Sequence, residues 1–180
     1  MTSDTTAIQS SHARLAANPA LTPVLAVLII AAATISGAWF FQLVLDIQPC
    51  PLCLEQRYAY YLIVPLAALL AFGAARGAPR PLLVAGLVVI ALAALGNSVL
   101  GTYHAGVEWK LWAGPTDCTG PIGNFGSASN LLQRLGTVKV VPCDVVQWHF
   151  LGLSLAGYNA LISALMAAIA AFGAIRSARS

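Results

Sequence analysis

Charge is what this sequence has least of. Only 8% of its 180 residues are charged, whereas a soluble domain typically carries about 25%. The net charge is +3 and the lysines and arginines form no dense cluster, which speaks against nucleic-acid binding. The scarcity of charge excludes an ordinary soluble domain, and the 59% hydrophobic content therefore calls for another explanation.

Long apolar blocks supply that explanation. A helix needs about 20 apolar residues to cross the hydrocarbon core of a bilayer, and the sequence has four such blocks, at about 21–45, 57–75, 81–103 and 149–175. They predict an all-α integral membrane protein, a single four-helix bundle over residues 18–176. The first block could instead be a signal peptide, but its charge-free run far exceeds an h-region of roughly 7–15 residues.

Segments outside the blocks complete the predicted topology. Polar tails precede and follow the bundle at 1–17, which we expect to be disordered, and at 177–180. A short loop at about 46–56 and a long one at about 104–148 join the spans on one side. In the long loop, "SASNLLQRLG" predicts a short amphipathic helix, lying either in the membrane interface or against the protein itself.

The charged residues orient the bundle. One side carries five arginines and a single acid: Arg14, Arg76, Arg80, Arg176, Arg179 and Asp4. The positive-inside rule places that side, with both termini, in the cytoplasm. The four tryptophans fall near the other side, as an interfacial belt predicts. We therefore expect both loops to face an outer compartment such as the bacterial periplasm.

All cysteines lie in those outer loops, at Cys50, Cys53, Cys118 and Cys143. An outer compartment permits disulfides, and an even count suggests two pairs. Sequence alone allows three connectivities.

The first pair sits in "PCPLCLEQR" at 49–57. Pro51 suits the first position of a helix, which would make Cys50 the cap and place both sulfurs at the positive end of the helix, where thiolates are favoured. Arg57 follows Cys53 by four residues and would share its helix face. The alternative for Arg57 is an arginine that reaches to the lipid headgroups.

Three interpretations of the cysteines remain open at this point. A non-enzymatic scaffold could contain two structural disulfides, or a zinc ion could bind cysteines. A redox relay could instead pass electrons from the long loop, within reach of a soluble thiol protein, to Cys50 and Cys53 at the bilayer edge, within reach of a lipid-soluble acceptor.

Three stretches carry a resemblance to a known family: "PCPLCLEQR" at 49–57, "YHAG" at 103–106 and "CDVVQWHFLGLSLAGYN" at 143–159. With their order along four spans, they resemble the bacterial disulfide bond formation protein B family, DsbB. The resemblance covers about 150 residues. His149 departs from it, since some members carry an acid there.

The resemblance implies an inner-membrane enzyme that reoxidises a periplasmic DsbA-type thiol oxidase and passes electrons to a quinone, either ubiquinone or menaquinone. By the family pattern, Cys118 forms the mixed disulfide with the partner, and Cys143 exchanges with Cys50. Cys53 delivers electrons to the quinone beside Arg57. His104 matches a histidine near the same region, although a structural role, paired with Glu108, explains it equally. The resting connectivity stays open between Cys50–Cys53 with Cys118–Cys143 and a rearranged Cys50–Cys143 bond.

Overall fold

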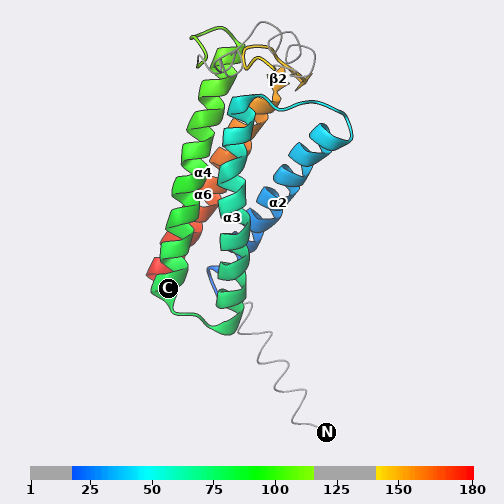
Figure 1. Ribbon diagram of the computed structural model, residues 1–180. Coiled ribbons are helices and arrows are strands. Elements are labelled where there is room, and N and C mark those ends of the chain that lie inside the picture. The colour runs from blue at the N-terminus through cyan, green and yellow to red at the C-terminus, as the bar shows by residue number, and fades with distance from the viewer. Residues whose placement is uncertain (1–17, 116–140) are drawn as a thin grey trace, which may run out of the picture.

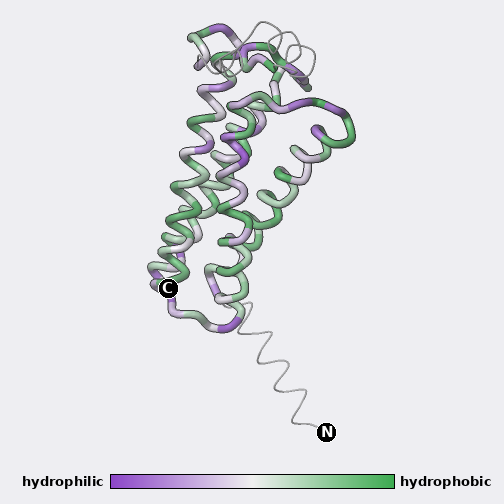
Figure 2. The backbone as a smooth tube through the Cα atoms, in the orientation of Figure 1, coloured by the Kyte–Doolittle hydropathy of each residue, from purple (hydrophilic) through white to green (hydrophobic). Residues whose placement is uncertain are grey.

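Four long helices make up most of the part of the protein that the structure describes (Figure 1). The structure is a computed structural model that describes residues 18–115 and 141–180. Its helices are α2 (Leu21–Leu43), α3 (Pro51–Arg76), α4 (Arg80–Glu108) and α6 (Leu155–Arg179). Each is long and apolar enough to cross a membrane, and hydrophobic residues cover the helices along their length (Figure 2). The predicted all-α, four-helix membrane fold is confirmed. Predictions for 1–17 and for the loop helix lie outside the described residues.

Helix ends differ from the apolar blocks in ways that matter for the site. Helix α3 begins at Pro51, so it includes most of the cysteine motif. Helix α4 continues to Glu108, which places His104 on a helix instead of in the long loop. The reason is that charge-free runs mark only the hydrocarbon core, whereas helices extend past it into the interface.

The fourth helix begins at Leu155, later than its apolar block, because a hairpin precedes it. Strands β1 (His149–Phe150) and β2 (Leu153–Ser154) pair antiparallel. Leu151 and Gly152 connect them with φ angles of 49° and 82°, and a two-residue turn with two positive φ angles matches the twist of a hairpin. Ser154 then caps α6 by accepting the Gly157 N–H at 3.2 Å.

Close packing of α4 against α6 sets the geometry of the bundle. A Cβ added at Gly101 would lie 3.0 Å from the Ala160 nitrogen, so glycine lets the two helices approach more closely than a larger residue would, as is common between membrane helices. Buried Leu87, Ile90 and Met166 belong to the core of the bundle.

Helix α2 stands apart from this packing at one end. It leans away from α3 where the 44–50 segment joins them (Figure 1). At the opposite end, Asn18 binds the Ala74 carbonyl at 3.0 Å and Arg80 donates to the Ser177 carbonyl. The bundle is therefore tied at one end, whereas at the other, where the cysteines lie, α2 leans away from α3.

Candidate functional site

The N-terminus of α3 places two free thiols side by side. Cys50 is the cap residue, as predicted, and its sulfur accepts the Cys53 backbone N–H at 3.3 Å. The two sulfurs are 3.0 Å apart. Cys50 is buried and Cys53 partly so. The motif explains this arrangement locally. Proline favours the first helical position, and the Cys50 sulfur accepts from an N–H group that has no partner within the helix.

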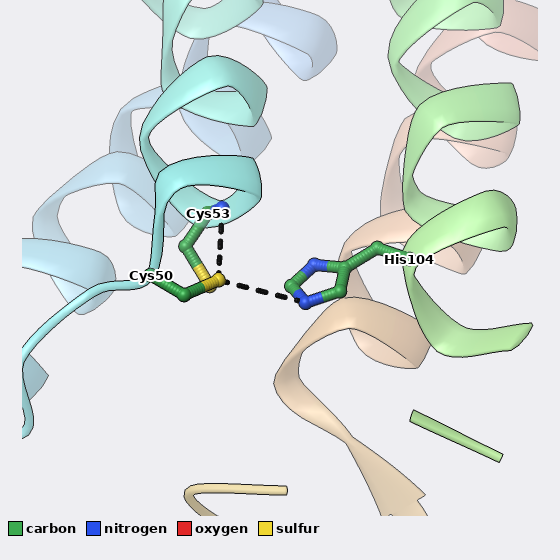
Figure 3. Close-up of side chains that lie close together, drawn as sticks. All are labelled: Cys50, Cys53 and His104. Carbon is green, nitrogen blue, oxygen red and sulfur yellow. Dashed lines mark hydrogen bonds between the residues drawn. The ribbon is translucent and has the colours of Figure 1, made fainter. Parts of the chain in front are cut away.

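His104 approaches the pair from α4 (Figure 3). Its Nε2 lies 3.6 Å from the Cys50 sulfur. The pKa of Cys50 is lowered to about 5, chiefly by the hydrogen bond with the Cys53 thiol and further by His104, while burial opposes the shift. Cys50 is thus predominantly a thiolate at neutral pH, which is the nucleophilic form.

Glu108 lies one helical turn beyond His104. Its carboxylate is 4.0 Å from His104 Nε2, and Ser154 at the start of α6 donates a hydrogen bond to it. The predicted i, i+4 relation between Glu108 and His104 is confirmed.

Cys143 completes the cluster from the far side of the long loop. It is disulfide-bonded and packs with Cys50 and Leu52 in a small buried group. A Cys50–Cys143 bond is not the state described here, because Cys50 is a free thiol. Cys118 lies outside the described residues.

The Arg57 side chain turns toward α2. It donates to Gln42 Oε1 at 2.6 Å and to the Ala38 carbonyl at 3.3 Å, and its guanidinium lies 5.3 Å from the centre of the Trp39 ring. The residue is only 8% exposed. The side chain is therefore enclosed by the protein, and it links α3 to α2.

These side chains surround a cavity of about 420 Å³ between α2, α3, α4, α6 and the 142–150 segment. Its wall is mainly apolar, with polar groups from Cys50, Cys53, Arg57, His104 and Glu108. A cavity of this size and character suits a small, largely apolar ligand.

Sequence reasoning missed a line of polar residues in the cavity wall, Gln56, Tyr60 and Asn159. Gln56 meets His104 Nδ1 at 2.8 Å and accepts from Asn159 at 2.6 Å, and Tyr60 donates to Asn159 at 2.6 Å. The signal was present, because a polar side chain inside an apolar span is by default a functional candidate.

A loop contact fixes the outer rim of the site. Lys110, just after α4, binds Asp144 at 2.5 Å, and both are exposed. This ammonium lowers the pKa of the Asp144 carboxyl. His149, the departure from the family pattern, lies exposed on β1.

A four-cysteine zinc site does not match this arrangement, because Cys143 is in a disulfide. Among the described residues, the ligand atoms of Cys50, Cys53 and His104 lie within 4.8 Å of one another. The fold and the site thus define a multi-pass membrane protein with a dithiol at one end.

The family model for disulfide bond formation protein DsbB matches residues 21–173. Disulfide bond formation protein B of Hahella chejuensis is 30% identical over 149 residues, covering 79% of this chain and 86% of that protein. Disulfide bond formation protein B 1 of Pseudomonas fluorescens is 32% identical over 158 residues, covering 83% and 86%. No solved structure gave a significant match. The chain belongs to the DsbB family, and is a membrane protein of disulfide bond formation.

Proposed function

We propose that this protein is a thiol:quinone oxidoreductase that reoxidises a periplasmic DsbA-type dithiol protein. One observation carries the proposal: a free dithiol caps a membrane helix in the wall of an apolar cavity, with disulfide-bonded Cys143 packed against it. Such a site has a sulfur partner on one side and a lipid-compatible space on the other, which is what a relay from protein thiols to a lipid-soluble acceptor requires.

The sulfur chemistry proceeds by exchange between pairs. The reduced partner protein attacks Cys118 of a Cys118–Cys143 disulfide, and it leaves oxidised while those two cysteines become thiols. The thiolate of Cys143 then attacks Cys50 of a Cys50–Cys53 disulfide, and exchange returns the first pair to its oxidised form. Cys50 and Cys53, now thiols, must lose two electrons and two protons to close the cycle.

A quinone bound in the cavity would accept those two electrons and two protons. The fit rests on the cavity itself, whose volume of about 420 Å³ and mainly apolar wall suit such a ring. Arg57 would hold a ring oxygen, since a guanidinium has five N–H donors and two of them go to α2 partners in the described part of the chain. Cys53 and His104 line the same space.

Redox potentials support a strongly oxidising acceptor. The DsbA–DsbB–quinone system is itself the known case of a periplasm kept oxidising by a membrane enzyme, and DsbA lies near −120 mV. Oxidation of DsbA by a glutathione pool at about −200 mV would be unfavourable by roughly 80 mV, or nearly 4 kcal/mol for two electrons.

We infer an inner-membrane location with the cysteine end in the periplasm. Support comes from Arg76, Arg80, Arg176 and Arg179, which lie at helix ends opposite the cysteines. Positive charge of this kind favours the cytoplasmic side.

The proposal is tested with purified protein, a reduced DsbA-type partner and ubiquinone or menaquinone. We expect stoichiometric quinone reduction, followed by its absorbance, as partner thiols disappear. Cys53→Ser should abolish quinone reduction. Full turnover by Cys53→Ser, or no partner oxidation by the wild type with either quinone, would refute the proposal.

A further inference from the structure

Polar residues of α3, α4 and α6, including Gln56, Tyr60 and Asn159 in the cavity wall, form a chain of hydrogen bonds with a single direction. Its upper end is His104, beside the Cys50 sulfur, and its lower end lies well inside the membrane span at Asn97. Donor and acceptor roles can be assigned link by link, because amide nitrogens only donate and amide oxygens only accept.

The Gln56 amide decides the proton on His104. Asn159 Nδ2 donates to Gln56 Oε1 at 2.6 Å, so the other end of the amide, the Nε2 donor, is the atom 2.8 Å from His104 Nδ1. A donor facing Nδ1 requires a free lone pair there. The proton of a neutral His104 is therefore on Nε2, the nitrogen 3.6 Å from the Cys50 sulfur.

The orientation of Asn159 is fixed in turn from below. Its Oδ1 accepts from the Tyr60 hydroxyl at 2.6 Å and from Asn97 Nδ2 at 3.4 Å. Asn97 Nδ2 also donates to Ser163 Oγ at 3.0 Å, and Ser163 lies 3.2 Å from the Tyr60 oxygen. Since the Tyr60 proton goes to Asn159, Ser163 supplies its own proton to Tyr60. Every link thus donates upward.

We propose that this chain, running from Asn97 through Ser163, Tyr60, Asn159 and Gln56, holds His104 as a neutral imidazole whose Nε2–H points at Cys50. Gln56 and Asn159 are positioning residues for His104, and His104 stabilises the Cys50 thiolate as a hydrogen-bond donor. The inference deepens the proposed function, since Cys50 is the thiol that exchanges with Cys143.

Other ionisable groups around the pair do not reverse this arrangement. Glu108 lies 4.0 Å from His104 Nε2, and the Cys53 sulfur lies 3.0 Å from that of Cys50. Arg57 turns toward α2. Lys110 pairs with Asp144 at the exposed rim of the site. Ionised Glu108 favours a second proton on the ring. That proton would sit on Nδ1 against the Gln56 N–H donor, so the chain opposes an imidazolium.

The test is the proton position on His104, read by nitrogen-15 NMR of histidine-labelled protein with reduced cysteines. The protein has three histidines, and the double substitution His12→Gln and His149→Gln leaves His104 as the only one. Between pH 6 and 8 we expect one neutral species protonated at Nε2. A ring protonated at Nδ1, or at both nitrogens, would overturn the proposal.

Two variants separate positioning from mere packing. In Gln56→Glu, a carboxylate of the same shape can accept from both Asn159 and Nδ1–H, so His104 should become doubly protonated at pH 7. In Asn159→Leu, Gln56 is free to turn, and species protonated at Nδ1 should appear. Ser98→Ala is the matched control, because Ser98 binds the Ala160 carbonyl between the same helices, α4 and α6, outside the chain. Spectra of Asn159→Leu and Gln56→Glu identical to that of Ser98→Ala would contradict the positioning role.

This experiment needs neither quinone nor partner protein. A failed oxidase assay with the expected His104 spectrum would leave the hydrogen-bond chain standing without the proposed function. The opposite result would remove the chain and keep the oxidase.

Discussion

Cys50 combines burial with a stabilised negative charge. A buried thiol ordinarily resists ionisation, but here the sulfur sits over the first free N–H groups of α3 and beside two hydrogen-bond donors, the Cys53 thiol and His104. The result is a thiolate that is shielded from solvent and still reactive toward a disulfide brought against it.

The pH dependence of Cys50 follows from its pKa of about 5. In the reduced protein, iodoacetamide should modify Cys50 at a rate that rises as pH increases through about 5 and then levels, because only the thiolate reacts. His104→Ala should move the midpoint upward, since a donor is lost. Peptide mass spectrometry over a pH series measures both. A wild-type midpoint near the ordinary thiol value of about 8.5 would contradict the assignment.

Arg57 is positioned to serve a ligand in the cavity without contacting the sulfurs. Arg57→Ala should raise the apparent KM for quinone about tenfold or more, because a hydrogen bond to a charged donor contributes about 1.5–3 kcal/mol. Exchange between the two sulfur pairs should continue. Arg76→Ala, which removes a guanidinium over Phe72 at the opposite end, is the control. Equal quinone KM values for the two variants would count against Arg57.

Helix α2 forms one wall of the cavity, and Gly37 leaves space in that wall. A Cβ at Gly37 meets nothing within 4 Å, and Gly37 lines the cavity. Gly37→Leu should therefore fold normally and fill space that a ligand would use.

We expect Gly37→Leu to raise the apparent KM for quinone several-fold in steady-state assays while leaving the unfolding temperature in detergent unchanged. Gly96→Leu provides the comparison, because a Cβ at Gly96 on α4 also meets nothing within 4 Å and Gly96 is not among the cavity residues. Unaltered quinone kinetics in Gly37→Leu would place the ligand elsewhere.

The α4–α6 contact, in contrast, leaves little space for a larger residue at Gly101. Gly101→Val should lower stability by about 1–3 kcal/mol, as overpacking does, because its Cβ would lie 3.0 Å from the Ala160 nitrogen and 3.1 Å from the Ala160 Cα. Thermal unfolding in detergent measures the loss. The same change should disturb His104 on α4 relative to Asn159 on α6. Stability equal to that of Gly96→Leu would show that the helices can separate at no cost.

The bundle as a whole has the reactive cysteines at one end and a group of arginines at the other. Alkaline phosphatase, which is active only where disulfides form, should be inactive when fused after Ala78, between α3 and α4, and active when fused after Pro115, beyond α4. The reason is the arginines that flank the first site, at Arg76 and Arg80. The reverse activities would invert the proposed topology.

Much of this protein follows from its sequence alone. Four apolar blocks with almost no charge determine a four-helix membrane bundle, because unpaired backbone groups are too costly in lipid for most other folds. Pro51 after Cys50 determines where α3 begins and which residue caps it. Both the preference of proline for the first helical position and the capping by the preceding residue depend only on neighbouring residues. Motif order along the chain was sufficient to find the family, and with it the expected roles of the four cysteines.

Only the tertiary structure decided what surrounds the sulfurs. Arg57 shares a helix face with Cys53 in sequence terms, yet it turns to Gln42 and Ala38 because α2 offers acceptors that helix periodicity cannot reveal. Gln56 and Asn159 are 103 positions apart, and they meet because α3 and α6 both pack against α4. Spacing along one chain fixes what lies on a helix face, whereas the direction of a buried hydrogen-bond chain depends on three helices at once.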